Sequence, residues 1–345
     1  MGALLFLSAV SLVSLASYSQ TLFWRQLIWY AAAFFLILLG SGFNWSWLLR
    51  WPVFRYGLYW LSVLLLLVSN LQSNVVRGTK SWLFIGNFQF EPAEVAKIAL
   101  VILLAGFLTR RYLAVWRAKY LFLSFFYALL PATLIAIHPD LGSTIVVLSI
   151  WVAVIFVGGV HKKTFLIGLG AVIIAFILLW TFFLKPYQKD RLTAFMFPER
   201  DPLGINYNVI QSKIAIGSAG FWGKGFGEGP QTQLRFLPEA QTDFIFAAFT
   251  EEWGILGATF LILTFILVIF RFIDISLRAG SNDAKFVIFG GALIFFIQFL
   301  INVGANMGLV PVTGITLPFV SYGGSSLLTI AILIGIIQHI KLESR

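Results

Sequence analysis

The residues of this chain best suited to chemistry are charged side chains inside or beside long apolar stretches. Asp243 stands in FLPEAQTDFIF, after a polar turn and directly before an apolar run that continues past Phe260. Glu251 and Glu252 follow about 12 Å further on, if the run is a helix rising about 1.5 Å per residue. Charged groups in spanning segments are rare, and by default they pair or line a polar cavity. The start of this run is therefore a candidate site.

A second candidate lies in FEPAEVAKIALVILLAGF, where Pro92 suits the first turn of a helix. Glu94 and Lys97 are then three residues apart on one helix face. In one interpretation the two side chains neutralise each other near the outer interface, with Lys97 reaching toward the head groups. In the other they form the wall of a polar cavity in which Lys97 meets an anionic substrate. The sequence leaves both open.

Two of the carboxylates also have a structural interpretation as helix caps. Thr242 or Asp243 can cap the following helix, because a side-chain oxygen there accepts from free backbone N–H groups and suits the helix dipole. Against capping alone, Glu94 and Lys97 approach from the same membrane side. Asp140, in HPDLGST, precedes another apolar run, and capping explains it better than catalysis.

The elements that position these residues are membrane helices. The chain has 345 residues, of which 59% are hydrophobic and 11% charged, with a mean hydropathy of +0.92. This composition predicts one all-α integral membrane domain, residues 1–345, because about 20 apolar residues cross about 30 Å of hydrocarbon. The first span lacks a basic leader and is interpreted as an uncleaved anchor. The ten predicted spans are 3–19, 23–42, 54–70, 93–109, 119–137, 141–159, 163–184, 243–270, 284–307 and 322–340.

The basic residues set the orientation of this bundle. With the N-terminus in the cytoplasm, thirteen Lys and Arg fall on the inner side, against Arg77 and Lys80 outside and Arg25 at a helix edge. Both termini are therefore predicted to be cytoplasmic. The net charge of +10 then mostly reflects the Lys and Arg residues on the inner side of the membrane, and it gives no support to a nucleic-acid partner. The absence of cysteine excludes thiolate chemistry and disulfides.

Residues 185–242 form one long outer segment, rich in Gly and Pro. Loops of this length are usually functional or disordered. Tyr207, Ile210 and Ile214 recur at helical spacing, which predicts a short amphipathic helix at the membrane surface. A later stretch, GLVPVTGITLPFVSYGGSS, carries no charge, and its Gly and Pro residues predict a re-entrant or broken segment. The outer loop VRGTKSWLFIG holds Arg77, Lys80 and Trp82, whose simplest role is interfacial anchoring.

Taken together, these stretches resemble the shape, elongation, division and sporulation (SEDS) family of polytopic peptidoglycan polymerases. The resemblance runs from about residue 70 to the C-terminus, through GTKSW, FEPAEVAKIA, HPDLGST, YNVIQSKIAIGS, TQLRFLPEAQTDFIF, EEWG and GITLPFVSYGGSS in the expected order. The stretches YNVIQSKIAIGS and TQLRFLPEAQTDFIF resemble the sequences of the RodA branch, which serves elongation, more than those of the FtsW branch, which serves division.

The resemblance implies ten transmembrane helices, cytoplasmic termini and a large extracytoplasmic loop between the seventh and eighth helices. It also implies polymerisation of lipid II at the outer face of the cytoplasmic membrane, with release of undecaprenyl pyrophosphate. By motif, Asp243 corresponds to the essential acidic residue, Trp82 to the other commonly required position, and Glu94 and Lys97 to a polar cavity. A class B penicillin-binding transpeptidase is the implied partner.

This chain departs from the family pattern at three positions. Ala93 stands where Ser is common, His138 where Gln is common, and Ser81 where Arg is frequent. The missing cation at Ser81 affects how the loop meets a pyrophosphate, and Arg77 and Lys80 are placed to compensate.

The reaction needs a base for the attacking hydroxyl and charge stabilisation for the departing pyrophosphate. Asp243 is the predicted base, and the predicted pyrophosphate ligands are Lys97, Arg77, Lys80 and Arg191; a divalent cation is an alternative. Two other functions stay open. A lipid II flippase would need ionisable groups near the membrane midplane. A non-catalytic scaffold for a penicillin-binding protein would tolerate substitution of Asp243 and Trp82.

Overall fold

The computed structural model describes residues 1–71, 81–85, 88–111, 118–138, 140–157 and 206–343, with a few single residues between 170 and 204. Within these ranges the chain is almost wholly helical, and one short β-hairpin interrupts it. The first half contains α1 (Gly2–Tyr18), α2 (Gln20–Gly42), α3 (Trp45–Arg50), α4 (Pro52–Leu71), β1 (Leu83–Ile85), β2 (Phe88–Phe90), α5 (Pro92–Arg111), α6 (Ala118–Ile137) and α7 (Leu141–Val157). The second half contains α10 (Tyr207–Ser218), α11 (Pro230–Gln233), α12 (Ile245–Arg278), α13 (Asn282–Asn306) and α14 (Gly324–Glu343).

Nine of the ten predicted spans correspond to helices. Seven helices are long and apolar enough to cross a membrane, namely α2, α4, α5, α6, α12, α13 and α14, and α1 and α7 are shorter apolar helices. The predicted span 163–184 falls almost entirely outside the described residues, as do Arg77, Lys80 and Arg191. The prediction of an all-α integral membrane protein is thus confirmed, whereas the count of ten and the full extent of the 185–242 loop stay predictions.

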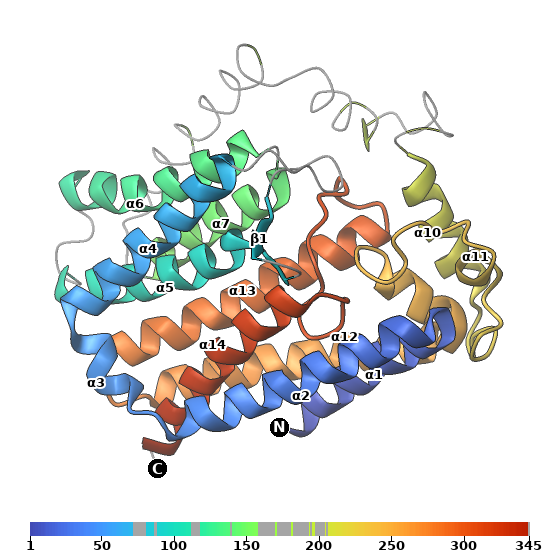
Figure 1. Ribbon diagram of the computed structural model, residues 1–345, viewed down its shortest axis with the longest axis horizontal. Helices are drawn as coiled ribbons and strands as arrows, with labels where there is room; N and C mark the ends of the chain where they lie inside the picture. The colour runs from blue at the N-terminus through green and yellow to red at the C-terminus, as the bar shows by residue number, and fades with distance from the viewer. Residues whose placement is uncertain are drawn as a thin grey trace.

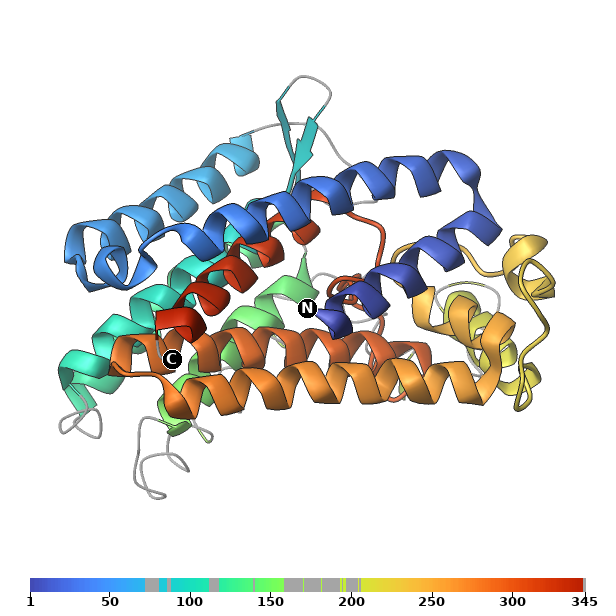
Figure 2. The ribbon, with the colours of Figure 1, turned by 90° about the horizontal axis from the view of Figure 1, so that it is seen from below.

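The helices form a bundle around α5 and α13 (Figure 1). Within the most apolar 18-residue stretch of each helix, 89% of the residues are buried inside the protein in α5, against 22% in α2. Seen from below, α12 and α13 lie side by side along the bundle, while α3 and the end of α14 lie far from α10 and α11 (Figure 2). A helix with apolar residues on every side and this much burial belongs to the interior of the bundle. The site residues on α5 are therefore held by protein on nearly all sides.

Local sequence explains where several helices begin. Asp140 Oδ1 accepts a hydrogen bond from Ser143 N at 2.9 Å, which confirms Asp140 as the cap of α7. Ser281 Oγ caps α13 by accepting from Ala284 N at 3.3 Å. α10 confirms the short helix expected in the outer segment, although Ile214 is exposed and the buried side chains are Ser212 and Ala215.

Close helix packing depends on small residues and one buried ion pair. A Cβ built on Gly335 of α14 would lie 3.1 Å from Gly40 Cα of α2, so these glycines let the two helices touch. At the opposite end from α10, Arg55 of α4 pairs with Asp283 of α13 at 3.1 Å and is only 4% exposed. The Arg55 side chain passes over Gly106 of α5, where an added Cβ would lie 1.6 Å from Nη1.

We expect Gly106→Ala to displace Arg55 and break its pair with Asp283. Loss of one partner leaves a buried charge uncompensated, which costs up to about 3–5 kcal/mol in a fully buried site and less here because Asp283 is partly exposed. The midpoint of thermal unfolding of the purified chain in detergent should fall. In an Asp283→Asn background the same substitution should cost much less, because the pair is already broken. An equal cost in both backgrounds would contradict this explanation.

Candidate active site

The turn that carries Asp243 runs directly into α12. The helix begins at Ile245 with Phe244 at the N-cap position, and Phe244 makes no side-chain capping hydrogen bond. The prediction that Thr242 or Asp243 caps this helix is therefore wrong. Instead, the Thr242 hydroxyl donates back to Glu239 Oε2 at 3.0 Å, and Glu239 itself has a positive φ of 53°. The chain turns tightly here before it enters the helix.

Two asparagines on α13 hold the backbone at Asp243. The carbonyl oxygen of Asp243 accepts hydrogen bonds from Asn302 Nδ2 at 3.0 Å and Asn306 Nδ2 at 2.8 Å. Asn306 Oδ1 also accepts from Ala247 N in the first turn of α12 at 3.0 Å, and Asn302 Nδ2 donates to the Ile315 carbonyl at 2.8 Å. Both asparagines are buried. Backbone groups that the turn leaves without helical partners are thus satisfied from the neighbouring helix.

Sequence analysis missed Asn302 and Asn306. Their signal was available, because two amide side chains four residues apart on one face of an apolar helix are costly unless they have partners. What the sequence did not show is which backbone they would bind, since the two segments lie 59 or more positions apart.

The segment after α13 closes the turn from the other side. Ser321 Oγ donates to the Thr242 carbonyl at 2.6 Å, and Tyr322 N donates to the Gln241 carbonyl at 2.9 Å. Residues 307–323 are not helical, and Leu317, Phe319 and Val320 are buried. The predicted broken segment is confirmed, and protein covers it as the membrane environment requires.

Glu94 and Lys97 form the expected ion pair. Lys97 Nζ lies 2.8 Å from Glu94 Oε1. Lys97 is 2% exposed and Glu94 is 4% exposed, so the prediction that Lys97 extends toward the head groups is wrong. A lysine buried this deeply keeps its charge only if nearby carboxylates compensate it.

Lys97 and the carboxyl groups near it form a group that we call the charge cluster, namely Glu91, Glu94, Lys97, Asp140 and Asp243. Burial, together with the negative charges of Glu94, Asp140 and Asp243, raises the pKa of Glu91 well above its ordinary 4.5, and Lys97 opposes this. Burial likewise raises the pKa of Asp140 above 3.8, against the hydrogen bonds from Ser143 and the charge of Lys97. Asp243 and the Glu94–Lys97 pair therefore all act on the same carboxyl group, that of Glu91.

Trp82 directly precedes β1. The hairpin pairs Leu83 with Phe90, and Trp82 and Glu91 are the residues that flank this pair outside the two strands. The Trp82 side chain is half-buried. Arg77, Lys80 and Arg191 lie outside the described residues, and their contact with a pyrophosphate stays a prediction. In the described part of the chain, no three His, Asp or Glu side chains are arranged to hold a metal ion.

Glu251 and Glu252 have a role that the sequence did not reveal. Glu251 accepts hydrogen bonds from Gln231 N at 2.8 Å, Thr232 N at 3.1 Å and Thr232 Oγ1 at 2.7 Å. Glu252 accepts from Gly227 N at 3.2 Å. Directly after them, α12 kinks at Gly254, whose φ is +70°. The two carboxylates therefore anchor the Gly-rich segment 220–233 to the helix.

Close backbone contact at the kink completes this anchor. Ile255 N donates to the Gly220 carbonyl at 3.0 Å, and Lys224 N donates to the Glu251 carbonyl at 2.9 Å. A Cβ on Gly223 would lie 2.1 Å from the Glu252 carbonyl oxygen, so only glycine fits.

The chain is similar to known proteins. A profile of the cell cycle protein family named for FtsW, RodA and SpoVE matches residues 1–345. The chain belongs to that family. It is 39% identical over 285 residues to the peptidoglycan glycosyltransferase MrdB of Escherichia coli K12, covering 82% of this chain and 76% of that protein. It is 38% identical over 280 residues to the stage V sporulation protein E of Bacillus subtilis 168, covering 79% and 74%.

Two solved structures of similar proteins have the same fold. One comes from work on polymerisation and crosslinking by a peptidoglycan synthase complex, with a TM-score of 0.85 and 32% identity, covering 99% of this chain and 96% of that one. The other is the rod shape determining protein RodA of Thermus thermophilus, with a TM-score of 0.71 and 27% identity over 99% and 94%. The family is thus established by sequence and by structure.

We expect Glu251→Gln to loosen the anchored segment. The substitution replaces a charged acceptor of three hydrogen bonds by an amide, and hydrogen bonds to charged groups contribute about 1.5–3 kcal/mol each. Segment 220–233 should then open more often, and trypsin should cleave faster after Lys224. The matched control is Glu228→Gln, because Glu228 is an exposed carboxylate of the same segment. Equal cleavage of both variants would show that Glu251 is not the anchor.

Removal of the Glu91 carboxyl should change how stability depends on pH. The folded chain holds the Glu91 proton more tightly than the unfolded chain, since the pKa of Glu91 is raised on folding. Stability therefore falls as the pH rises from about 4.5, the unfolded pKa, toward the higher folded pKa. In Glu91→Gln the unfolding temperature should fall less steeply as the pH rises, whereas Glu228→Gln should keep the slope of the parent chain. An unchanged slope in Glu91→Gln would contradict the shift.

Proposed function

We propose that this chain is a peptidoglycan glycosyltransferase of the RodA branch, which polymerises lipid II during cell elongation. Membership of the family and the 39% identity to a peptidoglycan glycosyltransferase support the reaction. The similarity to a rod shape determining protein supports the elongation branch over division. Lipid II carries its disaccharide on a lipid tail, so a site at the mouth of a membrane helix lets the tail stay in hydrocarbon while the sugar reacts in water.

The proposed base is Asp243. Its carboxylate takes the proton from the GlcNAc 4-hydroxyl of one lipid II as that oxygen bonds to the MurNAc anomeric carbon of another. The bond from that carbon to phosphate breaks, and its electron pair leaves with undecaprenyl pyrophosphate. The observation that carries this role is the fixed backbone of Asp243, held by Asn302 and Asn306 while the side chain stays half-buried. A held base needs little reorganisation when the substrate arrives.

The other members of the charge cluster are proposed to tune and position this base. Lys97, fixed by Glu94, supplies the positive charge that offsets the carboxylates around Asp243. Trp82, which directly precedes β1, is proposed to contact the sugar or its lipid carrier. Arg77, Lys80 and Arg191 remain the proposed ligands of the pyrophosphate, with a divalent cation as the alternative.

The flippase alternative fits the geometry less well. It would use ionisable groups near the middle of the bundle, and Glu251 and Glu252 were the candidates on α12. Both are occupied with the 220–233 segment. Lys97, another charge that the sequence places within a span, is paired with Glu94.

Location and partner follow from the same proposal. We infer a cytoplasmic-membrane protein with both termini in the cytoplasm and the active site on the outer face, which the distribution of Lys and Arg supports. A class B penicillin-binding transpeptidase is the proposed partner, and the similarity to a chain from a peptidoglycan synthase complex supports it.

We expect Asp243→Asn to abolish glycan synthesis without unfolding the chain. Loss of a general base typically costs about 10²- to 10⁴-fold in rate. The measurement is a gel of labelled lipid II polymerised by the purified chain, with and without the transpeptidase partner, together with the unfolding midpoint of each variant. The control is Asp274→Asn, which removes a carboxylate near the opposite end of α12 and should leave the product ladder intact.

Two outcomes would overturn the assignment. A full product ladder from Asp243→Asn would exclude Asp243 as the base. Unchanged cell elongation in cells whose only copy carries Asp243→Asn would favour the scaffold function, because a scaffold needs no catalytic carboxylate.

A further inference from the structure

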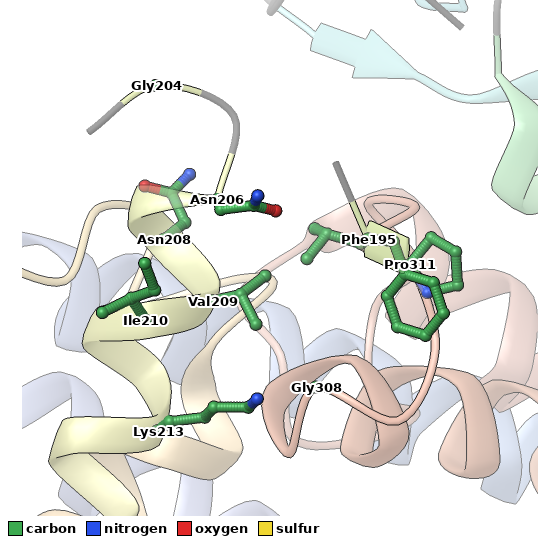
Figure 3. A pocket seen from close by; sticks show the side chains of 10 residues that line it. Phe195, Gly204, Asn206, Asn208, Val209, Ile210, Lys213, Gly308 and Pro311 are labelled. Atoms are coloured by element: carbon green, nitrogen blue, oxygen red, sulfur yellow. The ribbon is translucent and has the colours of Figure 1, made fainter. Parts of the chain in front are cut away.

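A cavity of about 270 Å³ lies between the first half of α10 and the segment that follows α13 (Figure 3). Its polar lining comes from Asn206, Asn208 and Lys213, and its apolar lining includes Val209 and Pro311. Cavities that enclose drug-sized ligands usually measure about 300–1,000 Å³. This one is therefore large enough for a compact polar group, but it cannot enclose a whole disaccharide peptide.

Among the described residues that line this cavity, Lys213 is the only charged one. Figure 3 shows its side chain reaching from α10 toward Gly308. A Cβ built on Gly308 would lie 2.3 Å from Lys213 Cε and 2.8 Å from Nζ, and Gly308 has a φ of +71°. Only glycine is suited to this backbone and leaves room for the lysine. The Lys213 side chain, which is exposed, thus passes beside Gly308 at the edge of the cavity.

No carboxylate in the described part of the chain forms an ion pair with Lys213. This distinguishes it from Lys97, which is neutralised by Glu94, and from Arg55, which is neutralised by Asp283. A cation that lines a cavity together with two side-chain amides, and without an acidic neighbour among the described lining residues, attracts an anion. Lysine acts as a point charge and commonly binds phosphate, whereas bidentate recognition of a carboxylate favours arginine.

The cavity is joined to the proposed catalytic residue by short links. Ser212, the neighbour of Lys213, donates through Oγ to the Asn306 carbonyl at 2.8 Å, and Asn306 holds the backbone of Asp243. Along the other wall, the chain runs from Gly308 to Gly314, whose built Cβ would lie 3.8 Å from Asp243 Oδ2. The Cα atoms of Gly308 and Gly314 therefore lie within about 22 Å of each other, because an extended chain advances no more than about 3.6 Å per residue.

From these observations we propose that the Lys213 cavity binds the pyrophosphate of a lipid-linked sugar and so positions that substrate relative to Asp243. The inference rests on the proposed polymerisation of lipid II, because that substrate supplies the pyrophosphate. It adds a binding residue on α10 to those expected from the hairpin region and from Arg191. The outer segment thereby becomes part of the substrate site as well as a covering of the bundle.

The test measures binding directly, so that it does not depend on catalysis. Purified full-length chain in nanodiscs would be titrated with fluorescent undecaprenyl pyrophosphate, with undecaprenol of the same tail, and with phosphatidylglycerol. The variants are Lys213→Gln, Lys213→Arg and Lys224→Gln, the last being an exposed lysine of the outer segment that does not line the cavity. Unfolding midpoints of all variants would be measured alongside.

We expect Lys213→Gln to weaken undecaprenyl pyrophosphate at least about ten-fold, since it removes one charge-assisted contact. Lys213→Arg should keep most of the affinity, Lys224→Gln all of it, and undecaprenol should respond to none of them. If Lys213→Gln melts like the parent chain and binds undecaprenyl pyrophosphate equally well, the cavity is not the pyrophosphate site. An equal loss for phosphatidylglycerol would also overturn the inference, because the cavity would then be a general phospholipid site.

The parent chain separates this inference from the proposed function. If it binds undecaprenyl pyrophosphate through Lys213 but makes no polymer from lipid II, the polymerase proposal fails and the binding site stands. If it makes polymer while Lys213→Gln binds undecaprenyl pyrophosphate normally, only the binding site fails.

Discussion

The arrangement around Asp243 depends on one requirement, that every backbone group left free by a broken helix inside a membrane bundle must find a partner. The turn before α12 and the segment after α13 are both non-helical, and each would be costly alone. Ser321 and Tyr322 of the second segment donate hydrogen bonds to backbone carbonyls of the turn. Asn302 and Asn306 of α13 donate to the carbonyl of Asp243. Because these contacts come from three separate segments, Asp243 is held only when the bundle is complete.

The same dependence explains the charges of the cluster. Lys97 is buried on the most buried helix of the bundle, and a lone ammonium there would be expelled or deprotonated. Glu94 neutralises it directly, while Glu91, Asp140 and Asp243 are the other carboxyl groups of the charge cluster. Asp140 does this while it caps α7, so one carboxylate serves both the start of a helix and the electrostatics of the site. Burial is the main cause of the raised pKa values of Glu91 and Asp140, and in both cases the charge of Glu94 adds to the rise while that of Lys97 opposes it.

Much of this was predictable from sequence where the signal is local. Hydrophobic length located nine helices now observed, Asp140 was recognised as a cap, and the spacing of Glu94 and Lys97 predicted their pair. The failures concern partners distant in sequence. For Lys97 the sequence left open an extension to the interface, which the burial of α5 by the other helices rules out. For Thr242 or Asp243 it left open a capping role, although the turn instead closes on Glu239 and α13. Composition carries no information about which helix covers which, so these contacts required the fold.

Helix α12 shows how a single element serves several parts of the site. Its first residues follow Asp243, and its buried Glu251 and Glu252 bind the backbone of segment 220–233 just before the kink at Gly254. α10, which carries Lys213, precedes that segment in the chain and packs on α12 and α13. The kink lets the outer segment dock on the helix, and Ser212, in the middle of α10, donates to the Asn306 carbonyl. Asp243 and the cavity beside Lys213 are thus both tied to α12 and α13, so their separation is set by the bundle rather than by a free loop.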